Sequence, residues 1–278
     1  MRGRERFDSP SPANDVIRVG VVGATGKMGR VVCAAVVDDP ALELAAGIAR
    51  HGGARLDGVI GRPGVEIFVS DRLETLADSG VEVAVDFTRA DAVLPNARFY
   101  AEHHMHAVIG TTGITSDDVE RIRELASGNG TNFVVAPDFS YGGAVMLEML
   151  RIAARHFPEV ELIETHLPTK ADAPSGTTMN TARQLAKVRR EARGSASKEV
   201  VPGARGGEIE GIRVHSLRLS GPPGEEEARF ARPGELLTLR LTAFDREPFA
   251  IGTLVAIKAV ASRPGLTYGL GPLLDLGA

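Results

Sequence analysis

The sequence predicts an α/β protein with a doubly wound parallel sheet and a smaller α+β domain that has a mixed sheet. Short apolar runs alternate with helical patterns up to about residue 140, as expected for parallel strands with helices on both faces. After Tyr141, longer strand-like runs follow, joined by turns rich in glycine and proline. We therefore expect a disordered leader (1–16), a dinucleotide-binding domain (17–140 and 249–278) and a substrate-binding and oligomerisation domain (141–248).

Composition favours small molecules over macromolecules as partners. The chain has 278 residues, 43% of them hydrophobic and 24% charged, which is ordinary for a globular protein with a substantial core. Its net charge of −4 argues against nucleic-acid or anionic-membrane surfaces, because both favour a basic excess. The single cysteine, Cys33, lies in an apolar run, so we expect a buried thiol and a cytoplasmic location. No run approaches the roughly 20 apolar residues of a membrane span.

The first strand and the turn after it predict a dinucleotide site. An apolar strand, 17–22, leads directly into the glycine turn 23–29, and a helix begins at Lys27 or Met28 and continues through Val37. In a Rossmann-type fold, such glycines let the backbone approach a pyrophosphate, and the helix N-terminus supplies partial positive charge. The spacing G-x-x-G-x-x-G departs from G-x-G-x-x-G, so a plain tight turn is the alternative.

The second strand, 42–49, bears on the choice of cofactor. NAD sites usually have an acidic residue after this strand, whereas Arg50 follows here, and a guanidinium suits the 2′-phosphate of NADPH. We expect NADPH, with NADH as the alternative because an arginine in a loop is commonly only solvated.

Three further runs continue the parallel pattern. Strands are predicted within 81–87, 106–113 and 132–140, with helices between them. The loops after these strands emerge at the carboxyl edge of the sheet, where ligands of doubly wound folds bind. A histidine cluster, 103–106, precedes a strand and should lie at the opposite edge, on the surface rather than around a metal.

The second domain is predicted to begin with a helix, a strand ending at His166 and another helix. Val160, Leu162 and Glu164 alternate with their neighbours, as in a half-buried strand. Further strands are expected over the ranges 211–219, 227–232 and 235–243, the last two joined by the turn Pro233-Gly234. A last helix, 249–261, and the tail should return to the first domain.

The segment 164–177 has the composition of an active site. His166 is a candidate proton donor, because a histidine beside a bound dianion can be an imidazolium at neutral pH. Lys170 offers a cation, and Ser175 caps a helix whose first amides could hold a carboxylate. Taken singly, these are also a surface histidine, a solvated lysine and an ordinary helix cap. Their spacing, together with the cofactor turn, favours the functional interpretation.

With these residues laid out, the chain resembles the dihydrodipicolinate reductases of the bacterial lysine pathway over nearly its whole length beyond about Ile17. Several motifs occur in the family's order. They are Gly23-Ala-Thr-Gly-Lys-Met-Gly29, Asp86-Phe-Thr88, Gly110-Thr-Thr-Gly113, Ala136-Pro-Asp-Phe-Ser140, Lys170-Ala-Asp-Ala-Pro-Ser-Gly-Thr177, and Gly203-Ala-Arg-Gly-Gly207 before Val214-His-Ser216.

The resemblance implies hydride transfer from NADPH or NADH to a cyclic conjugated imine bearing two carboxylates, in a homotetramer. His166 matches the family's proton donor and Lys170 its partner in substrate binding. Substrate contacts are expected from Leu167, Thr169, Ser175, Gly176 and Thr177. Cofactor contacts are expected from Gly23, Thr25, Gly26, Lys27, Met28, Arg50, Phe87, Gly110, Thr112, Pro137, Asp138 and Phe139.

Three positions depart from the family's pattern. Leu167 and Thr169 stand where the family typically has histidines, and Asp138 stands where asparagine is typical. A lost hydrogen bond in a polar pocket commonly costs about 1 to 3 kcal/mol, enough to change substrate preference. An unpaired carboxylate at Asp138 would also repel a dianion.

Three readings follow from this pattern. The first is a lysine-pathway reductase with an altered pocket. The second is a paralogue that reduces another unsaturated cyclic imine or enone, which the apolar Leu167 favours. The third is a non-catalytic NADPH-binding regulator, against which the retention of both His166 and Lys170 speaks. The number of matching motifs places the lysine-pathway reaction first.

Overall fold

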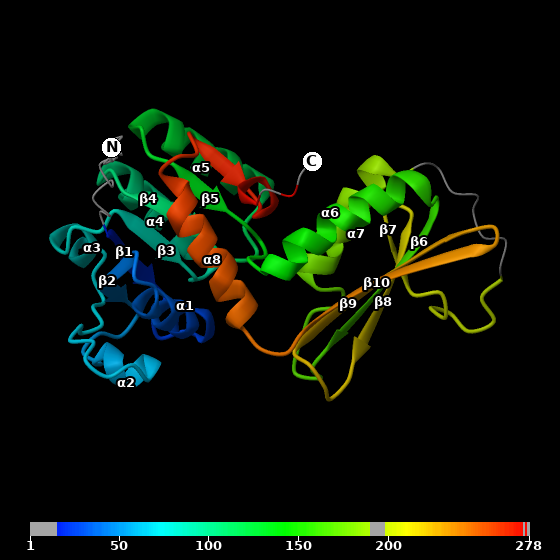
Figure 1. The fold of residues 1–278 in the computed structure, drawn as a ribbon, viewed down its shortest axis with the longest axis horizontal. Coiled ribbons are helices and arrows are strands. Elements are labelled where there is room, and N and C mark those ends of the chain that lie inside the picture. The colour runs from blue at the N-terminus through cyan, green and yellow to red at the C-terminus, as the bar shows by residue number, and fades with distance from the viewer. Residues whose placement is uncertain (1–15, 190–197, 275, 277–278) are drawn as a thin grey trace, which may run out of the picture.

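The computed structural model describes residues 16–189, 198–274 and 276, which form two sheets with their helices (Figure 1). All of the predicted disordered leader except Val16 lies outside the described residues.

The first sheet is parallel throughout, which confirms the predicted doubly wound class. Its strands lie in the order β11-β5-β4-β3-β1-β2, and every neighbouring pair is parallel. The strands are β1 (Ile17–Val22), β2 (Leu42–Ile48), β3 (Val83–Asp86), β4 (His106–Ile109), β5 (Phe133–Val135) and β11 (Leu266–Tyr268). They end a few residues earlier than some of the predicted runs, because Phe87 and Gly110 already belong to the loops at the carboxyl edge.

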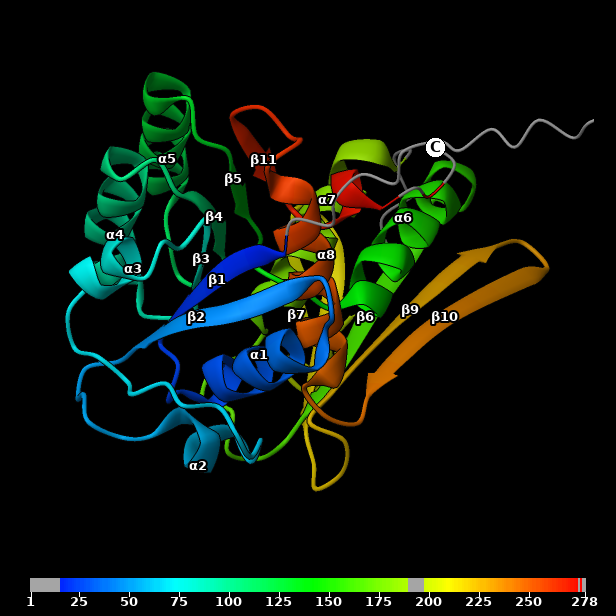
Figure 2. The same ribbon diagram turned by 60° about the vertical axis from the view of Figure 1, so that its left-hand side comes forward.

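Helices cover both faces of this sheet (Figure 2). On one face lie α1 (Lys27–Asp38) and α8 (Glu247–Val260), and on the other α4 (Ala90–Glu102) and α5 (Ser116–Asn129). Cys33, on the buried face of α1, packs in the core, and burial raises the pKa of its thiol to about 12. The predicted buried thiol is confirmed. Two short helices, α2 (Leu56–Ile60) and α3 (Glu74–Asp78), lie between β2 and β3.

The second sheet is mixed, as predicted. Its order is β10-β9-β6-β8-β7, in which β6 and β8 are parallel and the other pairs antiparallel. Its strands are β6 (Glu159–His166), β7 (Gly207–Ile209), β8 (Ile212–Arg218), β9 (Gly224–Arg232) and β10 (Glu235–Ala243). The predicted hairpin turn joins β9 to β10, and Gly234 has the positive φ of +84° that such a turn requires.

One face of the second sheet is covered by α6 (Tyr141–His156) and α7 (Gly176–Val188). Leu150 and Leu185 from these helices pack on Leu162 and Phe230, and all four side chains are fully buried. The chain then returns through α8 to the first sheet, where β11 pairs with β5 and a 3-10 turn, η1 (Gly271–Leu273), follows. This return was predicted.

The starts of two elements, β9 and α8, were predicted at the wrong residues, and one strand was not predicted. Strand β9 begins at Gly224 rather than Glu227, because its first three residues pair with the end of β6. Glycine and glutamate have low strand propensity, so pairing with β6 on one side and with β10 on the other holds the segment extended. Helix α8 begins at Glu247, two residues earlier than predicted, and the short β7 was not predicted at all.

Candidate active site

His166 ends strand β6, with an oxygen atom close to each ring nitrogen. Its Nδ1 lies 3.0 Å from the carbonyl oxygen of Pro223, and its Nε2 lies 3.5 Å from a carboxylate oxygen of Glu164. Since 19% of the side chain stays exposed, this imidazole can still meet a small molecule. The arrangement suits a proton donor.

Glu164 is the buried anion of the site. Its side chain has no exposed surface, accepts from the Ser175 amide at 2.9 Å and pairs with Arg218 at 3.1 Å. Burial alone would raise the pKa of Glu164, but hydrogen bonds from Ser175, Ser216 and Thr178 outweigh it and bring the pKa to about 2. The carboxylate therefore stays ionised and fixes both the histidine and the start of α7.

No role was predicted for Glu164 or Arg218. The available signal was the alternation of β6, which turns Glu164 to the same face as Val160 and Leu162. A glutamate at an inward position is rarely buried without a partner. Arg218, on β8, also donates to the carbonyl of Asp172 and so ties the loop before α7 to the sheet.

The first turn of α7 is open to a ligand. Ser175 is the N-cap, as predicted, and its hydroxyl accepts from the Thr178 amide at 3.2 Å. Within the described part of the chain, no hydrogen bond reaches the amides of Gly176 or Thr177, and both residues are exposed. The Ser175 amide is already bound to Glu164. Two free amides at a helix N-terminus can therefore hold a carboxylate.

Lys170, Leu167 and Thr169 lie beside the pocket rather than in its wall. The Nζ of Lys170 binds the carboxylate of Asp172 at 2.8 Å, and a turn joins the Lys170 amide to the Leu167 carbonyl. The Lys170 ammonium lowers the pKa of Asp172, chiefly through that hydrogen bond. Leu167 and Thr169 are exposed. The roles expected for these three residues remain predictions.

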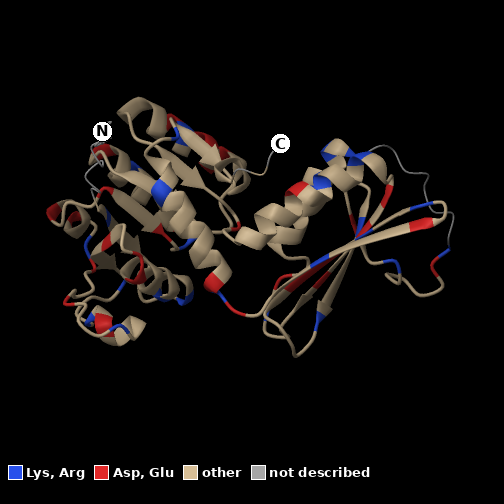
Figure 3. Cartoon of the chain, in the orientation of Figure 1, with Lys and Arg blue, Asp and Glu red and all other residues tan. Residues whose placement is uncertain are grey.

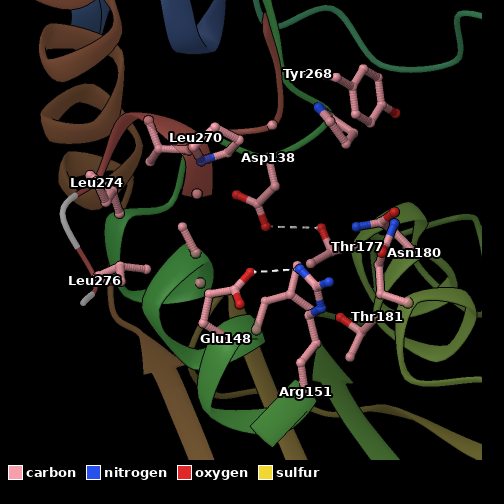
Figure 4. A pocket seen from close by; sticks show the side chains of 18 residues that line it. Asp138, Glu148, Arg151, Thr177, Asn180, Thr181, Tyr268, Leu270, Leu274 and Leu276 are labelled. Atoms are coloured by element: carbon pink, nitrogen blue, oxygen red, sulfur yellow. Dashed lines mark hydrogen bonds and ion pairs between the residues drawn. The ribbon is translucent and has the colours of Figure 1, made fainter. Parts of the chain in front are cut away.

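A small cavity of about 100 Å³ joins His166 to the start of α7. Asp138, in the loop after β5, contributes to its wall from the side of the first sheet. The Oδ1 of Asp138 accepts from the Ser140 amide at 2.7 Å, and its Oδ2 accepts from the Thr177 hydroxyl at 3.2 Å (Figure 4). Burial raises the pKa of Asp138, and these two bonds oppose the rise only in part. The carboxyl is thus bound to donors, but no cation pairs with it within the described residues.

A larger cavity, of about 470 Å³, is also lined by Asp138 and Thr177 (Figure 4). Helices α6 and α7 and the tail around Tyr268 form its walls. Glu148 and Arg151 of α6 form an ion pair of 2.9 Å there. The two cavities share the wall that Asp138 and Thr177 build, so both open beside the first turn of α7.

The turn between β1 and α1 has the shape of a phosphate site. Gly23 has a φ of +87°, and a Cβ at Gly29 would lie 2.0 Å from the Gly23 carbonyl oxygen, so side chains are excluded at both positions. Gly26 is the N-cap and gives α1 no side-chain cap. Among the described residues, the amides of Lys27 and Met28 have no partner. They point from a bare helix N-terminus, where an anion binds well.

Asp86, at the end of β3, organises the loops beside this turn. The fully buried carboxylate accepts from the Asn96 amide and the Tyr100 hydroxyl, each at 2.8 Å, and from the Thr88 hydroxyl at 2.6 Å. It also accepts from Thr111 at 3.2 Å. The resemblance singled out Asp86 only as part of a motif, and its role in joining two site loops depends on contacts between strands.

Phe87 and Gly110 meet closely at this edge. A Cβ at Gly110 would lie 2.2 Å from the Phe87 ring, so only glycine fits there. Phe139, expected to contact cofactor, is 2% exposed and packs edge-on against Phe87 with centroids 6.0 Å apart. Its side chain supports the loop from behind. Thr112 is exposed above the same edge.

The other predicted cofactor residues also lie at the carboxyl edge. Arg50 is exposed after β2, whose last carbonyl, of Ile48, accepts from the amides of Gly23 and Ala24 at 2.8 and 2.9 Å. Thr25 accepts from the Arg30 side chain through its carbonyl at 2.8 Å, and Pro137 follows β5 in the wall of the larger cavity. All twelve predicted cofactor positions thus belong to loops or turns at the carboxyl ends of β1 to β5 or to the start of α1.

Residues of both charge signs are interspersed along the elements of both sheets (Figure 3). Among the residues described, no group of histidine, cysteine and carboxylate side chains has the arrangement of a metal site. None of the described helices is both long enough and apolar enough to cross a bilayer.

Known proteins with similar sequences and structures were found for the whole described region. Residues 17–139 match the model of the dihydrodipicolinate reductase N-terminus, and residues 142–274 match that of its C-terminus. Curated 4-hydroxy-tetrahydrodipicolinate reductases of Nocardia farcinica and Mycolicibacterium vanbaalenii are 42% and 39% identical, over 94% of this chain and 99% and 100% of theirs.

A solved structure agrees with these relatives. The dipicolinate-bound dihydrodipicolinate reductase of Paenisporosarcina sp. TG-14 superposes with a TM-score of 0.82 at 33% identity, covering 93% of this chain and 100% of that one. An amine dehydrogenase of Mycobacterium smegmatis, 16% identical with a TM-score of 0.67, shares the fold. The names of the close relatives support the first of the three readings, not the paralogue or the regulator. The chain belongs to the dihydrodipicolinate reductase family.

Proposed function

We propose that this protein reduces a dihydrodipicolinate-type cyclic imine with a hydride from NADPH, and that His166 gives the accompanying proton. The observation that carries the proposal is the His166 ring, held between the Pro223 carbonyl and the Glu164 carboxylate at the wall of a small cavity. The relatives named 4-hydroxy-tetrahydrodipicolinate reductase support the reaction class.

The residues of the first sheet fit a dinucleotide. The unpartnered amides of Lys27 and Met28 would bind the pyrophosphate, and Gly23 would let it approach the backbone. Arg50 would bind a 2′-phosphate, which is why we propose NADPH over NADH. Gly110 and Phe87 would shape the wall near the nicotinamide. When bound, the reduced nicotinamide supplies the hydride.

The residues of the second sheet fit a carboxylate-bearing ring. The amides of Gly176 and Thr177 would bind one carboxylate, since no hydrogen bond reaches them within the described residues. Lys170 would reach the substrate by leaving Asp172, its partner at 2.8 Å. His166 then delivers its proton to the atom that gains electron density as the hydride adds to the ring. Glu164 and the Pro223 carbonyl hold the ring of His166 in place.

We also propose that the protein is a cytoplasmic homotetramer assembled through the second sheet. The hairpin of β9 and β10 exposes Leu236, and β8 and the residue after it expose Leu217 and Leu219. Exposed leucines along strands are a frequent feature of subunit interfaces. Light scattering of the purified protein should give four times the mass of one chain, and a monomeric mass would refute the assembly.

One assay tests the reaction. Purified protein is given NADPH, or NADH, with freshly generated 4-hydroxy-tetrahydrodipicolinate, and oxidation of the cofactor is followed by absorbance. We expect turnover, with NADPH preferred. His166→Ala and Lys170→Ala should each lower kcat at least tenfold and leave the Kd of NADPH unchanged within about twofold. Turnover of other cyclic imines without turnover of this substrate would refute the proposal, as would unchanged rates in both variants.

A second experiment tests the departures from the family. Leu167→His combined with Asp138→Asn should improve kcat/KM for the dihydrodipicolinate substrate, because it restores a donor and removes a carboxyl near a dianion. Leu167→Gln alone is the matched control, since it adds polarity without an imidazole. Lower kcat/KM in the combined variant would show that these positions do not limit the reaction.

A further inference from the structure

Two carboxyl groups face each other across neighbouring strands beside His166. In the antiparallel pairing of β6 with β9, Glu164 lies directly opposite Glu226. Residues opposite each other have Cβ atoms about 4.5 to 5.5 Å apart on one face of the sheet. That face is the buried one, because the next pairs along it are Leu162 with Ala228 and Val160 with Phe230.

The two glutamates have very different partners. Glu164 is paired with Arg218 at 3.1 Å, so a cation balances its charge, and it also lies 3.5 Å from His166. Glu226 has only hydroxyl donors, chiefly Thr178 at 2.9 Å, with no cation among its described partners. Asp138 is a third carboxyl beside it in the same cavity, and it too has no cation among the described residues.

Three neighbouring carboxyls cannot all be ionised in a pocket with cations for one of them. Like charges directly opposite in a sheet are unfavourable, and removal from water disfavours the charged form further. The group without a backbone donor or a cation is the easiest to protonate. Glu164 and Asp138 each accept from a backbone amide, that of Ser175 and of Ser140 respectively, whereas Glu226 has no such bond among the described residues.

We propose that Glu226 is a neutral carboxylic acid in the substrate pocket and donates a hydrogen bond to a carboxylate of the bound substrate. It is a specificity-determining residue for the reaction proposed above, and the inference rests on that proposed function. Ser175 donates its hydroxyl to Thr178 at 3.1 Å, and Thr178 donates to Oε2 of Glu226 at 2.9 Å.

The electrostatics of the surroundings agree with this geometry. Burial raises the pKa of Glu226, and the nearby charges of Asp138 and Glu164 raise it further, while hydroxyl bonds from Thr178 and Thr181 oppose them. Several elements face the carboxyl. Their charged or titratable groups are Glu164 and His166 of β6, Glu225 of β9, Asp138 after β5 and, through Glu164, Arg218 of β8. The residues that α6 and α7 with their N-caps, β10 and α8 add to the cavity wall are uncharged: Ser140, Gly143, Met146, Leu147, Ser175, Thr177, Thr178, Thr181, Leu241, Ala243 and Phe249.

A neutral acid gives ligand binding a characteristic pH dependence. Below the pKa of Glu226 the proton is in place, and a dicarboxylate meets a donor. Above it the ligand meets a carboxylate, so binding requires uptake of one proton and the Kd approaches a tenfold rise for each pH unit. An ionised Glu226 would instead select a cationic group on the ligand and would bind a dicarboxylate poorly at all pH values.

Calorimetric binding of dipicolinate to the full-length protein from about pH 6 to about pH 9 tests the inference. We expect Glu226→Gln, which keeps a neutral donor, to bind within threefold of wild type at the acid end. At alkaline pH, the Kd of Glu226→Gln should rise less than that of wild type, because the variant has no carboxyl group to ionise at this position. Glu226→Ala should bind at least tenfold more weakly. Glu227→Gln is the matched control, because that neighbour pairs with Arg229 and does not line the cavity. Any contribution from His166 is common to all four proteins and cancels in the comparison.

Two results would overturn the inference. One is a tenfold loss of binding in Glu226→Gln at the acid end, in a variant with an unchanged melting curve, since it would mean that the ionised form recognises the ligand. The other is an identical pH profile in wild type and Glu226→Gln. If the variants do not fold, the proton uptake that accompanies dipicolinate binding to wild type is measured at alkaline pH in buffers of different ionisation enthalpy. The absence of proton uptake would refute the inference. Turnover of the imine is measured alongside, so that a failure of the proposed reaction is distinguished from a failure of the proton inference.

Discussion

Glu164→Gln should destabilise the protein by about 3 kcal/mol at neutral pH. The pKa of this carboxyl falls from its ordinary 4.5 to about 2 on folding. At about 1.4 kcal/mol for each pKa unit, the ionised form contributes about 3 kcal/mol to the free energy of unfolding. Because the folded pKa is the lower one, the contribution is complete above about pH 5 and is lost as the pH falls from there towards 2. The stability difference between wild type and Glu164→Gln should therefore shrink along the same pH range.

Urea unfolding followed by circular dichroism measures this difference, since the chain has no Trp to serve as a fluorescent probe. Wild type and Glu164→Gln are compared at about pH 7 and at about pH 3. Glu159→Gln is the control, because Glu159 begins the same strand but is exposed, and its substitution should cost less than about 0.5 kcal/mol. A loss below about 1 kcal/mol at pH 7, or one that is the same at both pH values, would refute the reasoning.

Three other substitutions test separate parts of the molecule. Gly110→Ala puts a Cβ about 2.2 Å from the Phe87 ring, so we expect at least tenfold weaker binding of NADPH in calorimetry; an unchanged Kd would contradict the cofactor site. Arg218→Lys keeps the charge near Glu164 but loses the planar guanidinium, and should raise the KM of the imine at least threefold at constant NADPH affinity. Equal effects on both ligands would instead indicate a general loss of structure. Leu162→Ala, in the core of the second sheet, should cost about 2 to 5 kcal/mol in urea unfolding, and a cost below about 1 kcal/mol would show that this core is loosely packed.

Much of the fold was predictable because local patterns agree with the tertiary structure. The strands of the first sheet are short and apolar, and the glycine turn and the Ser175 cap have the residues that their backbone requires. The start of strand β9 was predicted at the wrong residue because its local sequence disagrees with the tertiary structure. Gly224 to Glu226 do not favour a strand, and pairing with β10 on one side and with the distant β6 on the other holds them in the sheet. Pairing of that kind leaves no local signal.

The site was predictable in part for similar reasons. His166 and the turn Ser175 to Thr177 carry their chemistry in the residue type and in their place at an element's end. Glu226 does not, because one glutamate in a run of three differs from its neighbours only in the strand face it occupies and in what lies opposite. Lys170 shows the reverse case. Its residue type predicted a substrate contact, but the conformation of the loop pairs it with Asp172.

The pairing of β11 with β5 has a consequence for how the protein is made. Leu266 pairs with Phe133, and the entire second sheet lies between them in the sequence. While the chain is being synthesised, one edge of β5 stays unpaired until β11 has emerged, so the first sheet closes after the second sheet has had time to form. Exposed strand edges are prone to associate with other chains. A pause of the ribosome shortly before β11 therefore prolongs the time during which the exposed edge of β5 can associate with other chains.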